Sequence, residues 1–233
     1  MEEEFEGALS GVKVLDLSRD LAGPYSSMML AELGADVVEV EHPRTGDETR
    51  LWPPFTNGVS GYFGTINRSK RSLALDLKSE AALAIIYELV AEADIVMQSF
   101  TPGVADRLGL GYGRLKQINP AIIYLSISGF GQDGPWRFKR GYDPILQAAS
   151  GFMSVTGEKD RSPVKSMIPV ADVSTGIYSL AAMLAALYRK ERTGKGQSID
   201  ISMFDVNVGM STVVGTRHLL TGEVSQRQGT ENP

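Results

Sequence analysis

The 233-residue sequence contains no cysteine and has two histidines, His42 and His218. Without cysteine there is no disulfide framework, no thiolate zinc site and no cysteine nucleophile. Two imidazoles leave little material for a multi-histidine metal centre or a histidine-dependent catalytic triad. Any chemistry must therefore rest mainly on carboxylates, hydroxyls, amines and the backbone, and we expect neither a metal nor a prosthetic group.

The chain also lacks an excess of positive charge, since 23 Lys and Arg stand against 28 Asp and Glu and give a formal net charge of −5. This balance favours neither nucleic acid nor an anionic membrane as a partner. The acidic start at residues 1–6 is the opposite of a basic leader sequence. The most apolar window, residues 177–188, is shorter than the roughly twenty residues of a membrane span. We therefore expect a cytoplasmic protein in which this window is a buried core helix.

Segments typical of strands and helices alternate along the chain. The pattern predicts an α/β fold, with a Rossmann-like, largely parallel sheet flanked by helices. The expected strands are residues 12–17, 35–41, 72–77, 94–97, 122–127 and 198–202, and the expected helices are about 25–33, 79–91, 113–118, 173–191 and 204–220.

Irregular segments with glycine and proline follow several of these strands, at 20–25, 41–47, 99–103 and 128–134. In open α/β sheets, ligands bind beyond the carboxyl ends of the strands. Gly23 and Pro24 open a helix whose free N–H groups would suit a phosphate, although they equally suit a simple turn. Glu41 ends the second strand, as a ribose-binding acid does in NAD enzymes, but the G-x-G-x-x-G loop is absent.

Basic side chains gather in loops and at element ends. They would suit a ligand with several phosphates, or they are surface residues in local salt bridges. Trp52 and Trp136 would either line a pocket or cover the surface. The basic residues are His42, Arg44, Arg50, Arg68, Lys70, Arg71, Arg107, Lys139 and Arg140.

Asp172 follows the short apolar segment 169–171 and lies just before the longest apolar helix that the sequence predicts. Its simplest role is to cap that helix. The alternative is a nucleophilic carboxylate, kept ionised by the helix N-terminus and shielded from water. Gly176, in the first turn, would then let a ligand approach the backbone.

Eight short motifs, in order along the chain, resemble those of the family III CoA-transferases, the CaiB/BaiF family. Each alone is weak, but together they extend over most of residues 11–205. They are LAGP at 21–24, LGADVV at 33–38, GDETR at 46–50, NRSKRS at 67–72, NPAIIY at 119–124, GFG at 129–131, GYD at 141–143 and TGKGQ at 193–197.

The resemblance implies transfer of CoA from an acyl-CoA to a small carboxylic acid, with CoA as substrate and Asp172 as the covalent nucleophile. A carboxylate needs no general base because it is already ionised at neutral pH. His42 and Ser99 depart from the family, which often has a basic residue and an asparagine there. The implied CoA-binding residues are Asp20, Leu21, Ala22, His42, Lys70, Ser99, Phe100, Arg107, Arg140 and Asp143.

The family also includes acyl-CoA racemases, whose proton-transferring histidine falls on Tyr142. A phenol with a pKa near 10 replaces an imidazole base poorly, which favours a transferase over a racemase or epimerase.

The length differs from the family, whose members have a second, smaller domain and form interlocked homodimers. We expect residues 1–202 to be the N-terminal part of the large CoA-binding domain. Residues 203–233 would be a helix and linker toward a small domain that this chain lacks. A non-catalytic CoA-binding subunit is the remaining alternative.

Overall fold

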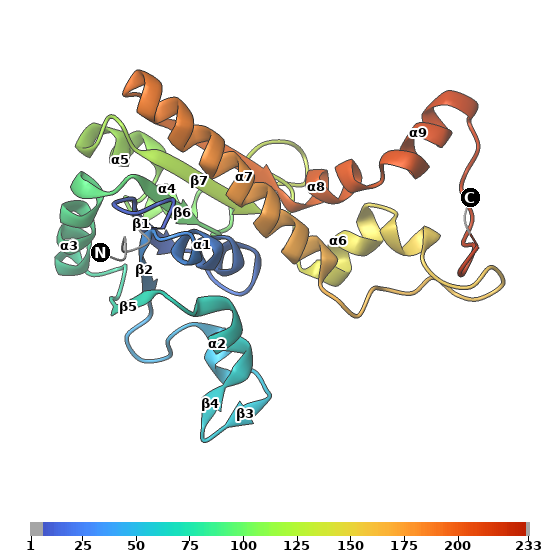
Figure 1. The fold of residues 1–233 in the computed structure, drawn as a ribbon, viewed down its shortest axis with the longest axis horizontal. Coiled ribbons are helices and arrows are strands. Elements are labelled where there is room, and N and C mark those ends of the chain that lie inside the picture. Colours follow the sequence, from blue (N-terminus) through green and yellow to red (C-terminus); the bar gives the residue numbers. More distant parts are fainter. Residues whose placement is uncertain (1–6, 232–233) are drawn as a thin grey trace, which may run out of the picture.

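The computed structural model describes residues 7–231, so the acidic start at residues 1–6 lies outside the described residues. Helices and strands alternate as the sequence predicts (Figure 1). The strands are β1 (Lys13–Leu17), β2 (Asp36–Glu41), β3 (Phe55–Thr56), β4 (Val59–Ser60), β5 (Arg71–Ala74), β6 (Ile95–Gln98), β7 (Ile123–Ser128) and β8 (Gln197–Ser202). The helices are α1 (Ala22–Glu32), α2 (Gly61–Asn67), α3 (Glu80–Glu92), α4 (Val104–Arg107), α5 (Tyr112–Ile118), α6 (Asp143–Ala149), α7 (Val170–Thr193), α8 (Met203–Met210) and α9 (Thr212–Thr221), with 3₁₀ turns η1 (Glu48–Leu51) and η2 (Phe152–Val155).

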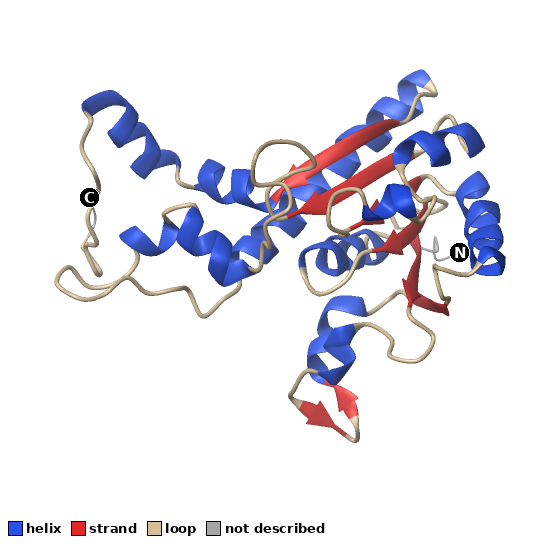
Figure 2. Ribbon diagram, turned by 180° about the vertical axis from the view of Figure 1, so that it is seen from behind, coloured by secondary structure: helices blue, strands red, loops and turns tan. Residues whose placement is uncertain are grey.

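Six strands form one parallel sheet in the order β5-β2-β1-β6-β7-β8. The chain runs outward from β1 through β2 to β5, returns to the centre at β6, and then runs the other way through β7 to β8. This is the strand order of Rossmann-type sheets, and it leaves a switch point between β1 and β6. The predicted α/β fold with a parallel sheet is therefore confirmed (Figure 2).

Helices cover both faces of the sheet, so the strands are apolar on both sides. Val14 and Ile95 face α1 and α7, whereas Leu15 and Val96 face α3 and α5. The alternation along each strand thus divides the core into two layers, with Asp16 on the α1 side of β1.

Helix α7 is the one helix of the described residues that is long and apolar enough to cross a membrane by length and composition alone. One face of α7 packs on the core, where Met183 and Ala186 are buried, as expected of a core helix. Its opposite face leaves Ile177 and Tyr188 exposed. A Cβ on Gly176 would lie 2.9 Å from the Tyr25 ring and 3.0 Å from the Ala22 carbonyl oxygen, so this glycine admits α1 rather than a ligand.

The protruding unit of β3, β4 and α2 was not predicted (Figure 1). Its strands have two residues each, too short for a periodic pattern. The sequence contains one indication of this hairpin, the dipeptide Asn57-Gly58, since Asn-Gly favours a tight turn. Both residues have positive φ in the structure (49° and 78°).

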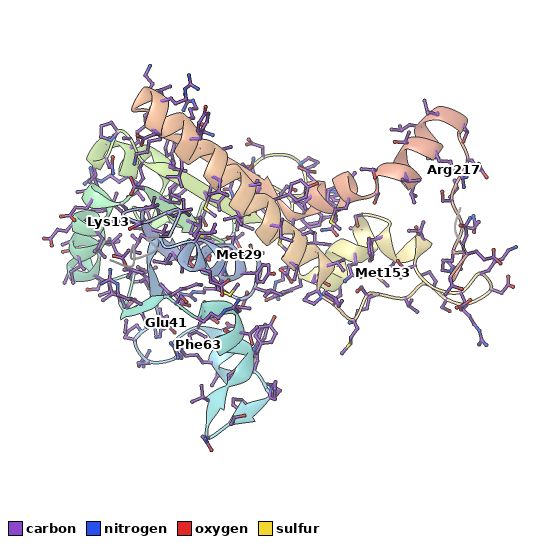
Figure 3. All side chains as sticks on the ribbon, viewed as in Figure 1. Lys13, Met29, Glu41, Phe63, Met153 and Arg217 are labelled. Atoms are coloured by element: carbon purple, nitrogen blue, oxygen red, sulfur yellow. The ribbon has the colours of Figure 1, made fainter. Side chains whose placement is uncertain are left out.

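An ion pair fastens this hairpin unit to the sheet. Nε and Nη2 of Arg50 donate to the two carboxylate oxygens of Glu41, each at 2.6 Å, and the guanidinium lies 3.6 Å from the centre of the Phe63 ring. Figure 3 shows Glu41 and Phe63 close together at this junction. Burial raises the pKa of Glu41, but hydrogen bonds from Arg50 and Ser72 outweigh it and lower the pKa to about 2. Arg50 and Glu41 therefore form an ion pair with each other.

The predicted helix at 204–220 is two helices, α8 and α9, separated at Ser211. Together with η2 and residues 156–168 they form an arm that extends away from the sheet (Figures 1 and 3). The arm exposes several apolar side chains, including Met167 (90% exposed), Leu219 (84%) and Leu220 (80%).

Candidate active site

A cavity of about 460 Å³ lies beyond the carboxyl ends of β1, β6 and β7, at the switch point of the sheet. Its walls come from the loops after these strands, from the hairpin unit and from the first turn of α7. The lining residues are Arg19, Asp20, Leu21, Ala22, Gly23, Trp52, Tyr62, Ser99, Phe100, Thr101, Pro102, Ile127, Ser128, Gly129, Arg137, Lys139, Arg140, Gly141, Tyr142, Asp172 and Met203.

Seven of the eleven predicted site residues meet in this cavity, although they are up to 152 positions apart in the chain. They are Asp20, Leu21, Ala22, Ser99, Phe100, Arg140 and Asp172. Trp52 also lines it, whereas Trp136 packs edge-on against Phe130 beside Phe204.

The other four predicted residues lie outside the cavity lining. His42 is half-buried beside Thr45, and Arg107 is exposed at the end of α4. The ammonium of Lys70 is buried between Asn67 and Asp16. The Asp143 carboxylate is turned into the start of α7.

Asp172 lies in the first turn of α7, and the predicted capping role of its side chain is wrong. The N-cap residue is Pro169, whose side chain has no atom that can accept a hydrogen bond. Asp143 caps the helix from α6 instead, because its Oδ2 accepts the N–H of Ala171 at 2.8 Å and that of Asp172 at 3.4 Å. The Asp172 carboxylate is thereby left free to face the cavity.

The expectation that Asp172 is fully ionised at neutral pH is also wrong. Burial raises its pKa to about 7, and the nearby carboxylates of Asp143 and Asp20 add to the rise. Desolvation and like charge thus outweigh the helix N-terminus. Asp172 therefore changes its charge near neutral pH.

The loop between β1 and α1 is fixed from beneath by Asp16, which is fully buried. Asp16 Oδ1 accepts the Ser18 N–H at 2.8 Å and the Ser18 hydroxyl at 2.5 Å, and its Oδ2 accepts the Ser27 hydroxyl of α1. Ser18 fills the space beside Gly23, where a Cβ would lie 2.2 Å from its hydroxyl oxygen. Beyond this turn Asp20 adopts a left-handed conformation (φ 69°) in the cavity wall.

Two further ionisable groups lie beside Asp16. The Lys70 ammonium is 3.4 Å from Asp16 Oδ2 and 2.6 Å from the Asn67 amide oxygen. Glu39 pairs with Asp16 across the strands, and burial together with Asp16 raises its pKa to about 8. Glu39 therefore holds a proton at neutral pH, and Lys70 is the counter-charge of Asp16.

The opposite wall is held by Gln98 at the end of β6. Its side-chain oxygen accepts the Phe100 N–H at 2.6 Å and its amide donates to Ser126 at 3.0 Å. The Ser99 hydroxyl accepts the Arg19 N–H at 2.9 Å. This bond joins the two loops that flank the switch point.

Four cationic side chains reach the cavity: Arg19, Arg137, Lys139 and Arg140. Arg140 was predicted to bind CoA, and Lys139 was among the basic residues that would suit a ligand with several phosphates, whereas Arg19 and Arg137 were not predicted. Within residues 7–231 none of the four makes an ion pair. Three come from the loop between Gly129 and Gly141, whose ends touch so closely that a Cβ on Gly141 would lie 2.2 Å from the Gly129 Cα. Gly129 and Gly141 are the first residues of the GFG and GYD motifs, so these motifs mark the two ends of the loop in the sequence.

Tyr62, on α2, is a further cavity residue that sequence reasoning missed. Burial raises its pKa to about 12, and the charge of Asp172 contributes. Its ring stacks at a tilt on Trp52, with 5.1 Å between centroids. At the end of β7, Ser128 lines the cavity, and its hydroxyl has no hydrogen-bond partner in the described part of the chain.

The sequence matches the model of CoA-transferase family III over residues 9–233. It is 44% identical to the succinate–glutarate CoA-transferase of Agrobacterium fabrum, over 97% of this chain and 58% of that protein. It is 41% identical to the acetyl-CoA:oxalate CoA-transferase of Acetobacter aceti, over 98% of this chain and 59% of the relative.

Among solved structures, the fold is similar to that of a CaiB/BaiF family protein from Brucella suis. The TM-score is 0.94 at 43% identity, with 98% of this chain and 62% of that chain covered. The chain therefore spans less than two thirds of the length of these relatives.

Proposed function

We propose a function for this chain, which belongs to family III of the CoA-transferases. The full-length protein moves CoA from an acyl-CoA thioester to a carboxylic acid, through a covalent intermediate on Asp172. The observation that carries the proposal is the position of this carboxylate. Asp172 lies in the cavity at the switch point of the sheet, with its backbone held by Asp143 and its pKa raised to about 7.

In the first half-reaction the ionised Asp172 attacks the carbonyl carbon of the donor thioester. The C–S bond breaks, which gives a mixed anhydride between the acyl group and Asp172 and releases the CoA thiolate. The thiolate then attacks the Asp172 carbonyl carbon. The donor acid leaves as a carboxylate, and an aspartyl-CoA thioester remains.

The second half-reaction repeats these steps with the acceptor carboxylate. It attacks the aspartyl thioester, the thiolate leaves, and the thiolate then attacks the acceptor carbonyl. Asp172 returns as a carboxylate, and no net proton is gained or lost. A carboxylate with a raised pKa is less solvated and therefore a better nucleophile, at the cost of a smaller ionised fraction.

The remaining cavity residues suit the two substrates. Four cavity cations that form no ion pair within residues 7–231 (Arg19, Arg137, Lys139 and Arg140) would bind the phosphates of CoA, since Arg and Lys bind phosphate at close range. The paired rings of Trp52 and Tyr62 would enclose the acyl group. The relatives named above act on small carboxylic acids, and we propose the same substrate class here.

The racemase alternative needs a base at Tyr142. This side chain is 58% exposed at the cavity rim, and a phenol replaces an imidazole base poorly. Solvent deuterium at the substrate α-carbon, without exchange of CoA between acids, would decide for a racemase.

We further propose that the exposed apolar side chains of the arm are covered in the full-length protein, by its remaining residues and by a second copy in an interlocked homodimer. Side chains such as Met167 and Leu219 are too exposed and too apolar for a free surface. Residues 203–233 would then be the linker toward a small domain. The alternative, a non-catalytic CoA-binding subunit, predicts that CoA binds but no acyl transfer occurs.

The test is mass spectrometry of the protein after incubation with an acyl-CoA. The peptide that contains Asp172 should gain the mass of CoA less one water, and Asp172→Asn should not. Tyr178→Phe, on the exposed side of the same helix, is the matched control and should be labelled normally. Normal CoA transfer by Asp172→Ala in the full-length protein would overturn the proposal.

A further inference from the structure

Gln147 is a fully buried residue that does not line the cavity. It lies on α6, which packs beside the first turns of α7 (Figure 1). Its side-chain amide makes two hydrogen bonds, one to Asp143, which binds the backbone of Asp172, and one to Ser166, in the segment that precedes α7. We propose that Gln147 is a positioning residue that, through Asp143, holds the Asp172 nucleophile in place; this inference rests on the proposed role of Asp172.

The first bond joins Gln147 to the cap of α7. Its Nε2 donates to Asp143 Oδ1 at 2.5 Å, while the other oxygen of Asp143 accepts the Ala171 and Asp172 N–H groups. The Asp143 carboxylate is only 8% exposed. Because one oxygen is held by the Gln147 amide, the carboxylate cannot rotate away from the start of α7.

The second bond joins Gln147 to the segment that leads into α7. Its Oε1 accepts the Ser166 N–H at 2.8 Å. Most of residues 158–168 are exposed, so this bond is a main attachment of the segment to the body of the protein. A single amide therefore fixes both the cap of α7 and the chain entering it.

The amide of Gln147 suits both tasks. The group must accept an N–H on one side and donate to a carboxylate on the other, and the two faces of the Gln147 amide match this order. A glutamate would place a second acceptor beside Asp143, and a methionine would fill the volume without either bond. The N-cap residue of α7, Pro169, makes no side-chain cap, so Asp143 is the side chain that caps α7.

The experiment compares Gln147→Met and Gln147→Glu with the wild-type protein. At saturating acyl-CoA, we expect the rate of covalent labelling of Asp172 to fall about 10–100-fold in both variants, since small displacements of a nucleophile have effects of this size. The acyl-CoA concentration for half-maximal rate should change less than about twofold, because Gln147 does not line the cavity. A labelling rate at the wild-type level in both variants would overturn the inference.

Asn119→Leu is the matched control. Asn119 is also an amide that binds backbone groups, at Val90 O, Ala93 O and the Ala121 N–H, but it lies before β7 at the opposite end of the sheet. This variant should lose stability while its folded fraction is labelled at the wild-type rate. A similar loss of labelling in Asn119→Leu would reduce the role of Gln147 to general stability.

A second measurement separates this inference from the proposed function. The amide hydrogen of Ala171, which is buried and bonded to Asp143, should exchange at least tenfold faster in Gln147→Met, with exchange at Met183 unchanged. Failure of wild-type labelling would refute the role of Asp172 but not this expectation. Unchanged exchange at Ala171 would refute the positioning role whatever the labelling shows.

Discussion

At the scale of single residues, the environment of each carboxylate decides its charge. Glu41, bound by Arg50, has a pKa of about 2, whereas Glu39, two residues earlier on the same face of β2, has a pKa of about 8. Asp172, with a pKa of about 7, changes its charge near neutrality. Burial acts on all three, and only Glu41 has a cation bound to both of its oxygens.

The raised pKa of Asp172 predicts the pH dependence of its labelling. The ionised form is the nucleophile, so the rate at saturating acyl-CoA should increase with pH around a midpoint near 7 and become constant above it. Removing the charge of Asp20 by Asp20→Asn should lower the midpoint, because that charge contributes to the rise. Labelling rates between pH 5 and 9 check both expectations; a midpoint near 4 in the wild type would contradict them.

Glu39 predicts a pH dependence of stability. Its pKa is higher in the folded than in the unfolded state, so its contribution decreases as pH rises from about 4.5 through about 8. Glu39→Gln removes this loss. The unfolding free energy of the variant minus that of the wild type should therefore be larger at pH 9 than at pH 5, by on the order of 4 kcal/mol. Urea unfolding at the two pH values measures it, and Glu92→Gln on the exposed end of α3 is the control.

At the scale of elements, the junction of β1 and α1 depends on a buried ion pair. Lys70 is 1% exposed and Asp16 is fully buried, so removing one partner leaves an uncompensated charge. We expect Lys70→Met to cost about 3–5 kcal/mol of unfolding free energy, and the double variant with Asp16→Asn to cost less than the sum of the single changes. Additive losses in urea unfolding would show that the two groups act independently.

The loop between β7 and α6 depends on the contact of Gly129 with Gly141. A Cβ on Gly129 would lie 2.6 Å from the Gly141 Cα, so Gly129→Ala must push the ends of the loop apart. The cationic residues of the loop would then move, and we expect acyl-CoA affinity to fall at least tenfold. Titration calorimetry measures the affinity. Gly134→Ala, in the same loop and with open space around its Cβ, shows the effect of a positive φ alone.

At the scale of the whole molecule, α8 packs against α7, whereas the outer part of the arm, α9 and residues 158–168, exposes apolar side chains. Replacing Leu219 and Leu220 by aspartate should leave the unfolding free energy of the sheet domain within about 0.5 kcal/mol, since both are at least 80% exposed. The same change should weaken self-association of the full-length protein. Sedimentation velocity measures the association, and dimers as stable as those of the wild type would contradict the prediction.

Most of the fold could be predicted from the sequence because alternating apolar runs specify the elements locally. All six strands of the parallel sheet were predicted, β5 being shorter than expected. The hairpin unit was missed because two-residue strands carry no period, and the break at Ser211 was missed because both helices continue the same apolar pattern.

The sequence by itself determined the fold class and the approximate positions of the six strands of the parallel sheet, and it indicated Asp172 as a candidate nucleophile. Only the tertiary structure decided what surrounds each group. It pairs Lys70 with Asp16, caps α7 with Asp143 in place of Asp172, and brings Arg19 and Arg137 to the cavity. The physical reason is that periodicity depends on neighbours within one element, whereas a pKa or an ion pair depends on groups that distant strands bring together.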